Sequence, residues 1–176
     1  MKYVLILMFL LTGCDAPSIP QSYPSSMESL VDEVRNQTFV QLKMEKELHP
    51  CGIGSGMKDK IRMLALSFNY YRELNIEEAR ELLMYATRVF LDKINSNQEI
   101  RPFLLNDPFT PFDIDITVFL RNLDGSYPNT EKLQVIAMTN GRFIYKIDTP
   151  ARKQYKTILT ETFAEAEKNL KTPVIL

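Results

Sequence analysis

The residues with the clearest chemical potential are the only histidine and a cysteine two positions after it, His49 and Cys51. An imidazole can deprotonate a nearby thiol or share a metal ion with it, so this spacing allows a nucleophile pair or part of a metal site. One histidine and one cysteine are too few ligands for a zinc site, however. The sequence therefore predicts no metal, no cofactor and no catalytic residue, and an enzyme that depends on Cys51 stays open as an alternative.

A glycine-rich segment comes next, with Gly52, Gly54 and Gly56 followed by Lys58 and Lys60. Free backbone N–H groups at the start of a helix bind anions, which makes such a segment a candidate anion site. It lacks the Gly-Lys-Ser/Thr ending of a P-loop, and it does not follow a predicted strand. We therefore interpret it as a flexible connection between two helices.

Two carboxylates, Asp113 and Asp115, alternate with Ile114 and Ile116. On a strand they would share one face, where the pKa of one could rise or the pair could hold a hard cation. Solvation on the exposed face of a half-buried strand explains the same pattern. We therefore expect both carboxylates to be exposed.

The segment between Arg101 and Phe112 is rich in proline and phenylalanine, and it is the candidate for recognition. Its prolines disfavour regular structure and its apolar side chains need cover, so we expect a packed loop. Aromatic side chains in a stiff loop lose little entropy on binding. The residues expected to contact a partner are Arg101, Phe103, Asn106, Phe109 and Phe112. The alternative is that the apolar members only cap the core.

Residues 1–13 have the properties of an export signal. Lys2 supplies a positive charge, and residues 3–11 form an apolar run that is too short to span a membrane, which takes about 20 residues. The run ends in Leu11-Thr12-Gly13-Cys14, and this motif resembles the lipobox of bacterial prolipoproteins. The resemblance implies cleavage before Cys14, a diacylglyceryl group on its thiol, and a new terminal amine that can be acylated.

The same resemblance implies a location on the cell membrane, with the rest of the chain facing the periplasm or the cell exterior. Residues 14–25 are rich in proline and serine, which predicts a flexible tether. Residues 26–176 are then expected to form a single globular domain, since 45% of the chain is apolar and its length suits one core. With Cys14 lipidated, Cys51 is a free thiol, part of an intermolecular disulfide or a buried side chain.

Hydrophobic periodicity predicts three helices before the first strand. The first follows a capping-box pattern, Ser25-x-x-Glu28, and extends from Met27 to about Leu48. The second begins at Met57 and has a wide apolar face. The third begins after a second capping box, Asn75-x-x-Glu78, and extends to Asn95.

Three strands are predicted next, at residues 113–121, 133–139 and 142–148. The last two surround Asn140-Gly141, a strong hairpin signal because both positions accept a positive φ. Thr149-Pro150 is typical of a helix start, and an apolar stripe from Tyr155 to Leu170 predicts a final helix. The predicted fold is therefore α+β, with three N-terminal helices, a three-stranded antiparallel β-meander and a C-terminal helix.

The charge balance bears on function. Lysine and arginine number 21 against 22 aspartate and glutamate, giving a net charge of −1, so the chain lacks the basic surplus of a nucleic-acid binder. The predicted function is a membrane-anchored envelope lipoprotein whose domain is a protein-binding or assembly module, held on the membrane through Cys14. The expected partner is a protein. A small-ligand carrier, with a pocket between sheet and helices, is the alternative.

Overall fold

The computed structural model describes residues 26–129, 131–149 and 154–171. The predicted signal peptide, Cys14 and the tether lie outside the described residues. None of the described helices is long and apolar enough to cross a membrane. The elements in chain order are α1 (Met27–Lys46), β1 (His49–Met57), β2 (Ile61–Tyr70), α2 (Ile76–Ser96), the 3₁₀ helix η1 (Arg101–Phe103), β3 (Ile114–Leu120), β4 (Leu133–Thr139), β5 (Arg142–Thr149), β6 (Gln154–Thr162) and α3 (Phe163–Lys171).

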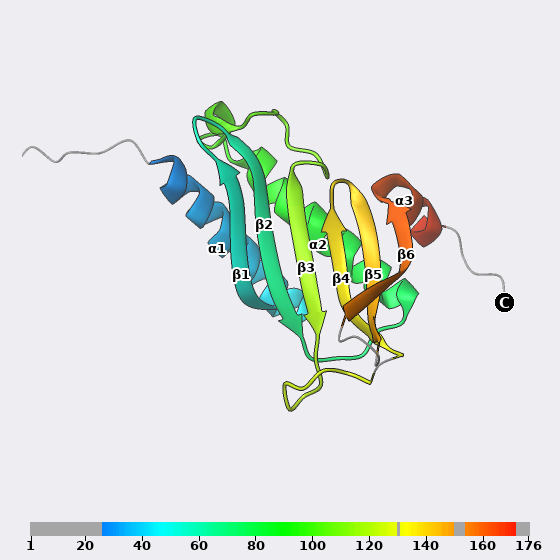
Figure 1. Ribbon diagram of the computed structural model, residues 1–176. Helices are drawn as coiled ribbons and strands as arrows, with labels where there is room; N and C mark the ends of the chain where they lie inside the picture. The colour runs from blue at the N-terminus through cyan, green and yellow to red at the C-terminus, as the bar shows by residue number, and fades with distance from the viewer. Residues whose placement is uncertain (1–25, 130, 150–153, 172–176) are drawn as a thin grey trace, which may run out of the picture.

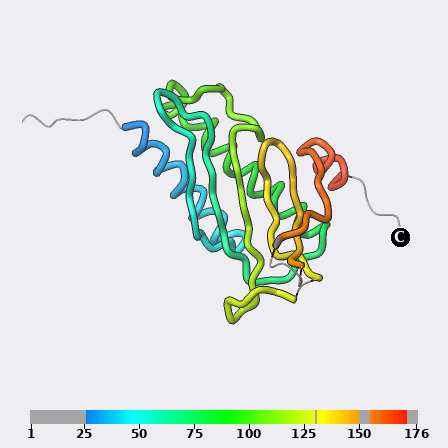
Figure 2. The backbone as a smooth tube through the Cα atoms, in the orientation of Figure 1, coloured from blue at the N-terminus to red at the C-terminus, as the bar shows by residue number. Residues whose placement is uncertain are grey.

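The six strands form one mixed sheet, and their order across the sheet is their order along the chain. β2 and β3 are parallel, with α2 as the crossover between them, and all other neighbouring strands are antiparallel. Helices α1 and α2 lie behind the sheet in Figure 1, and α3 follows β6 and contacts α2. Figure 2 shows the backbone from the same side, and no described helix crosses the near face of the sheet. We call this near face the open face.

The predicted fold is wrong in its first half. The segment predicted as a glycine loop and a second helix forms the hairpin β1–β2, so only one helix precedes the strands. Residues of β2 alternate between buried and less buried, with Leu64, Leu66 and Phe68 on the buried side. Because the residues between them are small or apolar, the same segment also fits the spacing of an apolar helix face. The sequence alone therefore does not distinguish a strand from a helix here.

The predicted final helix is also wrong, because its first part is strand β6. Threonines at 157, 160 and 162 are β-branched and favour a strand. Thr149, the predicted cap, ends β5, and Pro150 lies outside the described residues. Helix α3 begins only at Phe163, after a capping box in which Glu165 N donates to Thr162 Oγ1 at 3.2 Å and Thr162 N donates to Glu165 Oε2 at 2.7 Å.

Other predicted elements are confirmed. The capping box of α2 is present, with 2.9 Å bonds from Asn75 N to Glu78 Oε2 and from Glu78 N to Asn75 Oδ1. The hairpin β4–β5 turns at Asn140 and Gly141, whose φ angles are 48° and 68°. Helix α1 begins at Met27 as predicted, but its cap is Ser26 rather than the preceding serine.

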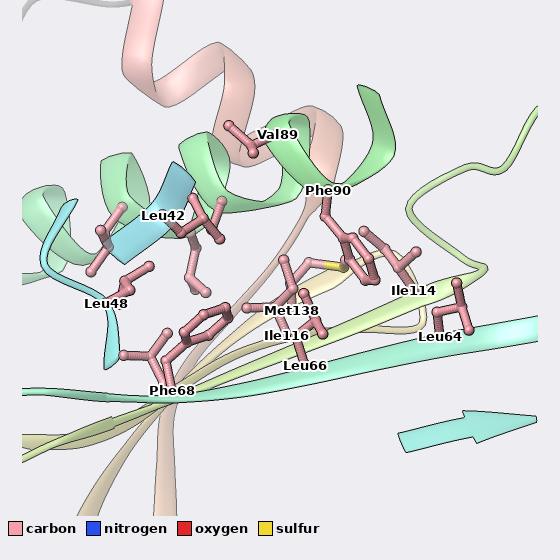
Figure 3. Close-up of a cluster of buried hydrophobic side chains, with 14 of the residues drawn as sticks. Leu42, Leu48, Leu64, Leu66, Phe68, Val89, Phe90, Ile114, Ile116 and Met138 are labelled. Carbon is pink, nitrogen blue, oxygen red and sulfur yellow. The ribbon is translucent and has the colours of Figure 1, made fainter. Parts of the chain in front are cut away.

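The hydrophobic core lies between the helices and the covered face of the sheet (Figure 3). Leu66 and Phe68 of β2 and Ile116 of β3 point toward helix α2, from which Phe90 points back toward the sheet. Each large apolar side chain that is fully buried in this way contributes about 1.5–3 kcal/mol to stability. The packing explains why the covered face of β2 and β3 is apolar, whereas the open face is free to carry other chemistry.

A buried polar cluster ties α3 to this core. Glu161 of β6 accepts hydrogen bonds from Arg80 Nε at 2.7 Å, from the Tyr145 hydroxyl at 2.5 Å and from Asn169 Nδ2 at 2.9 Å. Burial alone would raise the pKa of Glu161, but these three hydrogen bonds outweigh burial and hold the pKa below its usual value. Burial and the bond to Glu161 raise the pKa of Tyr145. A charged carboxylate therefore joins α2, β5, β6 and α3.

Candidate binding surface

The open face of the sheet is the candidate binding surface. Residues that are paired in register face the same side of a sheet, so the pairings define rows across it. One row from β2 to β6 consists of Ser67, Thr117, Ala137, Ile144 and Thr160. The adjacent row consists of Asn69, Phe119, Val135, Lys146 and Thr157. The first row consists of small or hydroxyl-bearing side chains apart from Ile144, whereas the second carries larger side chains.

Glycines of β1 extend the flat part of this face. Gly52 pairs with Ser67 and Gly54 pairs with Ala65. A Cβ on Gly52 would lie 3.3 Å from the Cβ of Ser67, and one on Gly54 would lie 3.2 Å from that of Ala65. The two strands approach this closely because the glycines have no side chain. The segment is therefore an edge strand, neither the flexible connection that we predicted nor an anion loop at a helix start.

The centre of the open face is apolar. Val135 and Ala137 are only 5% and 8% exposed, although no described helix covers them. Val135 lies between Phe119 and Lys146, and Ala137 lies between Thr117 and Ile144. The residues on a solvent-exposed sheet face are normally polar, so this centre differs from an ordinary solvent-facing surface.

Aromatic side chains gather at the end of the open face where β3 ends. The guanidinium carbon of Arg121 lies 3.8 Å from the ring centroid of Tyr127 and 5.9 Å from that of Phe119. Burial raises the pKa of Tyr155, and its hydrogen bond with Tyr127 raises it further. Tyr127 and Tyr155 still expose 51% and 44% of their surface. These side chains hold one another in place and leave ring surface available to a partner.

The cluster continues onto β1 and the end of β2. His49 and Tyr71 meet edge to face, with ring centroids 5.2 Å apart and planes at 76°. They border a hollow of about 400 Å³ that Leu123 also lines. We call the following six residues the aromatic band: His49, Tyr71, Phe119, Arg121, Tyr127 and Tyr155.

Hydrogen bonds within residues 121–129 hold the loop that carries Tyr127. Asn122 Nδ2 donates to Ser126 Oγ at 2.8 Å and to Tyr127 O at 3.1 Å. Ser126 donates through Oγ at 2.6 Å and through N at 2.9 Å to Asp124 Oδ1, which lowers the pKa of Asp124. The loop is thus internally bonded, and it presents Leu123 at its tip with 89% of the residue's surface exposed.

Cys51 and His49 do not form an activated pair in this geometry. Cys51 is a free, exposed cysteine at a bulge in β1, whereas the ring of His49 packs on Tyr71. Burial raises the pKa of Cys51, and the positive charge of Arg121 only partly offsets this. A nucleophilic thiol requires the opposite shift. Among the described residues, no group of three or more His, Cys, Asp or Glu side chains could hold a metal ion.

Asp113 is buried, contrary to the prediction that it is exposed. It lies just before β3 and accepts hydrogen bonds from Thr110 N at 2.8 Å, Thr110 Oγ1 at 2.7 Å and Asn106 Nδ2 at 2.5 Å. Asp115 is half-buried and pairs with Ala65 on the open face. The carboxylate of Asp113 therefore fixes the preceding loop, because three donors converge on it.

The predicted recognition loop is packed, as the sequence indicates. Phe109 is buried. The backbone N–H of Phe109 donates to Asn95 Oδ1 at 2.8 Å, and Asn95 Nδ2 donates to the carbonyl oxygen of Phe109 at 2.9 Å. Phe103 is half-buried against the core. Since both rings pack inward, neither offers a partner much surface.

The outer part of the same loop is more accessible. Arg101 Nε lies 3.0 Å from Asp107 Oδ1, and Phe112 is 71% exposed. The ring of Phe112 lies over Gly141, where a Cβ would be 2.8 Å from Cε1 of the ring. A binding role for Arg101, Phe103, Asn106, Phe109 and Phe112 as a set stays a prediction.

The aromatic band is not apparent from the sequence. Its residues come from β1, the end of β2, the end of β3, the following loop and β6, and only the pairing of the strands brings them together. One signal was available, since Phe119 alternates with Val118 and Leu120 and is therefore an aromatic residue on the exposed side of a predicted strand.

Comparison with protein families, with curated proteins and with solved structures finds no match for this chain. We therefore base its function on the geometry of the described residues.

Proposed function

We propose that this chain is a membrane-anchored envelope lipoprotein whose domain binds a protein partner through the open face of its sheet. The observation that carries this choice is the aromatic band, in which Arg121 packs over Tyr127 and near Phe119 on a face without a described covering helix. Tyrosine and arginine are among the residues that contribute most to protein interfaces, and tyrosine buries a large area at a low cost in conformational entropy.

The two halves of the open face suit a protein surface. The band offers aromatic rings and one guanidinium to apolar side chains and carbonyl groups of a partner. Beside it, the small side chains of Ser67, Thr117 and Ala137 let a partner approach the sheet closely. A nucleic acid is a poorer fit because the chain has a net charge of −1 and phosphate neutralisation needs a basic surface.

The alternatives gain less support. A Cys51-dependent enzyme would need a lowered thiol pKa, whereas burial raises it. A carrier with its pocket between sheet and helices would need space where the fully buried side chains of Leu66, Phe68 and Phe90 meet.

The anchor rests on the lipobox resemblance at Cys14, and it has its own test. We expect the wild-type chain to incorporate labelled fatty acid in a bacterial host and to sediment with membranes. A Cys14→Ser variant is expected to lose both properties, because no other residue supplies the thiol at the cleavage site. Unchanged labelling and membrane attachment in Cys14→Ser would contradict the anchor.

The binding surface can be tested by photocrosslinking in intact cells. A photoreactive phenylalanine analogue replaces Tyr127 in one variant and Gln37, an exposed residue of α1 on the helical side, in the other. We expect a discrete protein adduct from position 127 only. Adding Arg121→Leu is expected to weaken that adduct, since Arg121 positions the ring at 127. Equal adducts from both positions, or none from position 127, would contradict the proposed surface.

A further inference from the structure

Helix α1, which follows the predicted tether, begins at the end of the sheet opposite the aromatic band. Arg35 of α1 donates from Nη2 to Gly54 O of β1 at 2.7 Å, so the middles of these two elements lie side by side. Helix α1 and strand β1 run in opposite directions (Figure 1). Ser26 lies about 13 Å along the helix from Arg35, and Lys58 lies about 13 Å along the extended chain from Gly54, toward the same end of the domain. The first turn of α1 and the β1–β2 turn therefore lie at one end of the domain (Figure 1).

The loops at this end form one connected surface. Lys60 Nζ, in the β1–β2 turn, donates to Pro102 O of η1. Leu105 N donates to Ile61 O at 2.8 Å, and Gly141 N donates to Pro111 O at 3.1 Å. The β1–β2 turn, η1, residues 104–113 and the β4–β5 turn thus support one another. We call these four segments the tether end.

Two large apolar side chains are exposed at the tether end, Leu105 at 54% and Phe112 at 71%. The exposed cations near them are Lys58, Lys60, Arg62 and Arg142.

Several carboxylates limit the positive charge of this end. Asp107 is paired with Arg101, and Asp113 is buried under three hydrogen bonds. The exposed ones at or near this end are Glu28, Asp59, Glu99 and Glu165. The charges of the two signs are therefore close to balanced, and the apolar pair Leu105 and Phe112 has to supply most of any attraction.

The tether sets how far this end can lie from a membrane. If the lipid is on Cys14, residues 14–25 connect it to α1, and even a fully extended chain of that length reaches only about 40 Å. Such a short connection keeps the tether end at an effective concentration in the millimolar range beside the lipid surface. A contact that would be too weak for a free domain then suffices. This step rests on the anchor of the proposed function.

We infer that the tether end rests on the phospholipid surface, with Leu105 and Phe112 in the interfacial layer and with Lys58, Lys60 and Arg142 beside the headgroups. Aromatic and aliphatic side chains with flanking cations are the composition that membrane interfaces favour. The aromatic band then points away from the membrane, because α1, about 30 Å long, separates the two ends. The open face is thereby presented to a partner beyond the lipid surface.

The absence of tryptophan from the chain makes a direct test available. Single tryptophans are introduced at the tether end, as Leu105→Trp, and in the loop beside the band, as Leu123→Trp. Both replaced side chains are exposed, so both variants are expected to fold. The full-length lipidated proteins are reconstituted into vesicles of phosphatidylcholine and phosphatidylglycerol with bromine-labelled acyl chains. We expect blue-shifted emission and several-fold stronger quenching for Leu105→Trp than for Leu123→Trp.

Vesicle flotation separates the failure of this inference from the failure of the anchor. If both variants float with the vesicles but are quenched equally, the docking of the tether end is overturned while the anchor stands. If neither variant floats, the lipid on Cys14 is overturned and the docking with it. Unfolding of each variant in urea verifies that the two proteins are equally folded.

Discussion

The Nε atom of Arg80 lies 2.7 Å from Oε1 of Glu161, and both side chains are almost fully buried. The pair connects helix α2 with the last strand, β6, across 81 positions of the chain. Such a pair is costly to bury, and it is favourable only when further hydrogen bonds satisfy the carboxylate. Tyr145 and Asn169 supply them.

Removing the cation from this pair is expected to destabilise the domain. Arg80→Leu leaves the carboxylate of Glu161 buried without its charged partner, and such changes cost roughly 3–5 kcal/mol. The matched control is Arg72→Leu, which breaks an exposed pair with Glu47 at 3.8 Å and is expected to cost at most about 1 kcal/mol. The free energy of unfolding in urea measures both. Similar losses of unfolding free energy in the two variants would contradict a larger contribution from the buried pair.

The same carboxylate predicts a pH dependence. The folded-state pKa of Glu161 is lowered, so the charged carboxylate contributes stability that is fully present above its unfolded pKa, about 4.3. That contribution is lost as the pH falls through the lower folded-state pKa. We expect Glu161→Gln to be less stable than wild type near neutral pH, with the difference shrinking in acid. Urea midpoints measured from neutral pH downwards check this, and a difference that does not shrink in acid contradicts it.

The parts of the fold that could be predicted are those that local chemistry determines. Asn140-Gly141 specifies a hairpin because few other residue pairs accept positive φ at both positions. The Asn75-x-x-Glu78 box specifies a helix start because each side chain bonds the backbone of the other residue. Neither feature depends on distant parts of the chain, and both are present as predicted.

The parts that were wrong depend on distant contacts. The segment containing Leu64, Leu66 and Phe68 carries both a two-residue and a helical period, and its pairing with β3 along the sheet selects the strand. Gly54 would weaken an isolated strand, yet it fits β1 because a Cβ there would lie only 3.2 Å from the Cβ of Ala65. The aromatic band depends on the same strand pairings, so the sequence alone does not predict it.

The contact between Phe112 and Gly141 predicts a specific coupling. Gly141→Ala introduces a Cβ about where the ring of Phe112 lies and also strains a φ of 68°, so we expect a loss of more than about 1 kcal/mol. Gly125→Ala is the control, because its φ is 83° but nothing lies within 4 Å of the new Cβ.

A double-mutant cycle separates the clash from the strain. Phe112→Ala removes the ring, so Gly141→Ala is expected to cost less in that background than in wild type, with a coupling of about 0.5–3 kcal/mol. The free energies of unfolding of the four proteins give the coupling. Additive effects would mean that the ring moves aside at no cost, which would leave only the backbone strain at position 141.

The thiol of Cys51 is expected to react slowly at neutral pH. Its side chain is exposed, but burial of the sulfur raises its pKa, so little thiolate is present and the rate should rise as the pH approaches and passes the usual thiol value of about 8.5. Arg121→Leu removes the cation that partly offsets this, so the variant should react more slowly still at neutral pH. Labelling rates of the folded protein as a function of pH measure both effects, with the urea-unfolded chain as the reference and Cys51→Ser as the blank. Rapid labelling of the wild type at neutral pH would contradict the raised pKa and would return the Cys51-dependent enzyme to consideration.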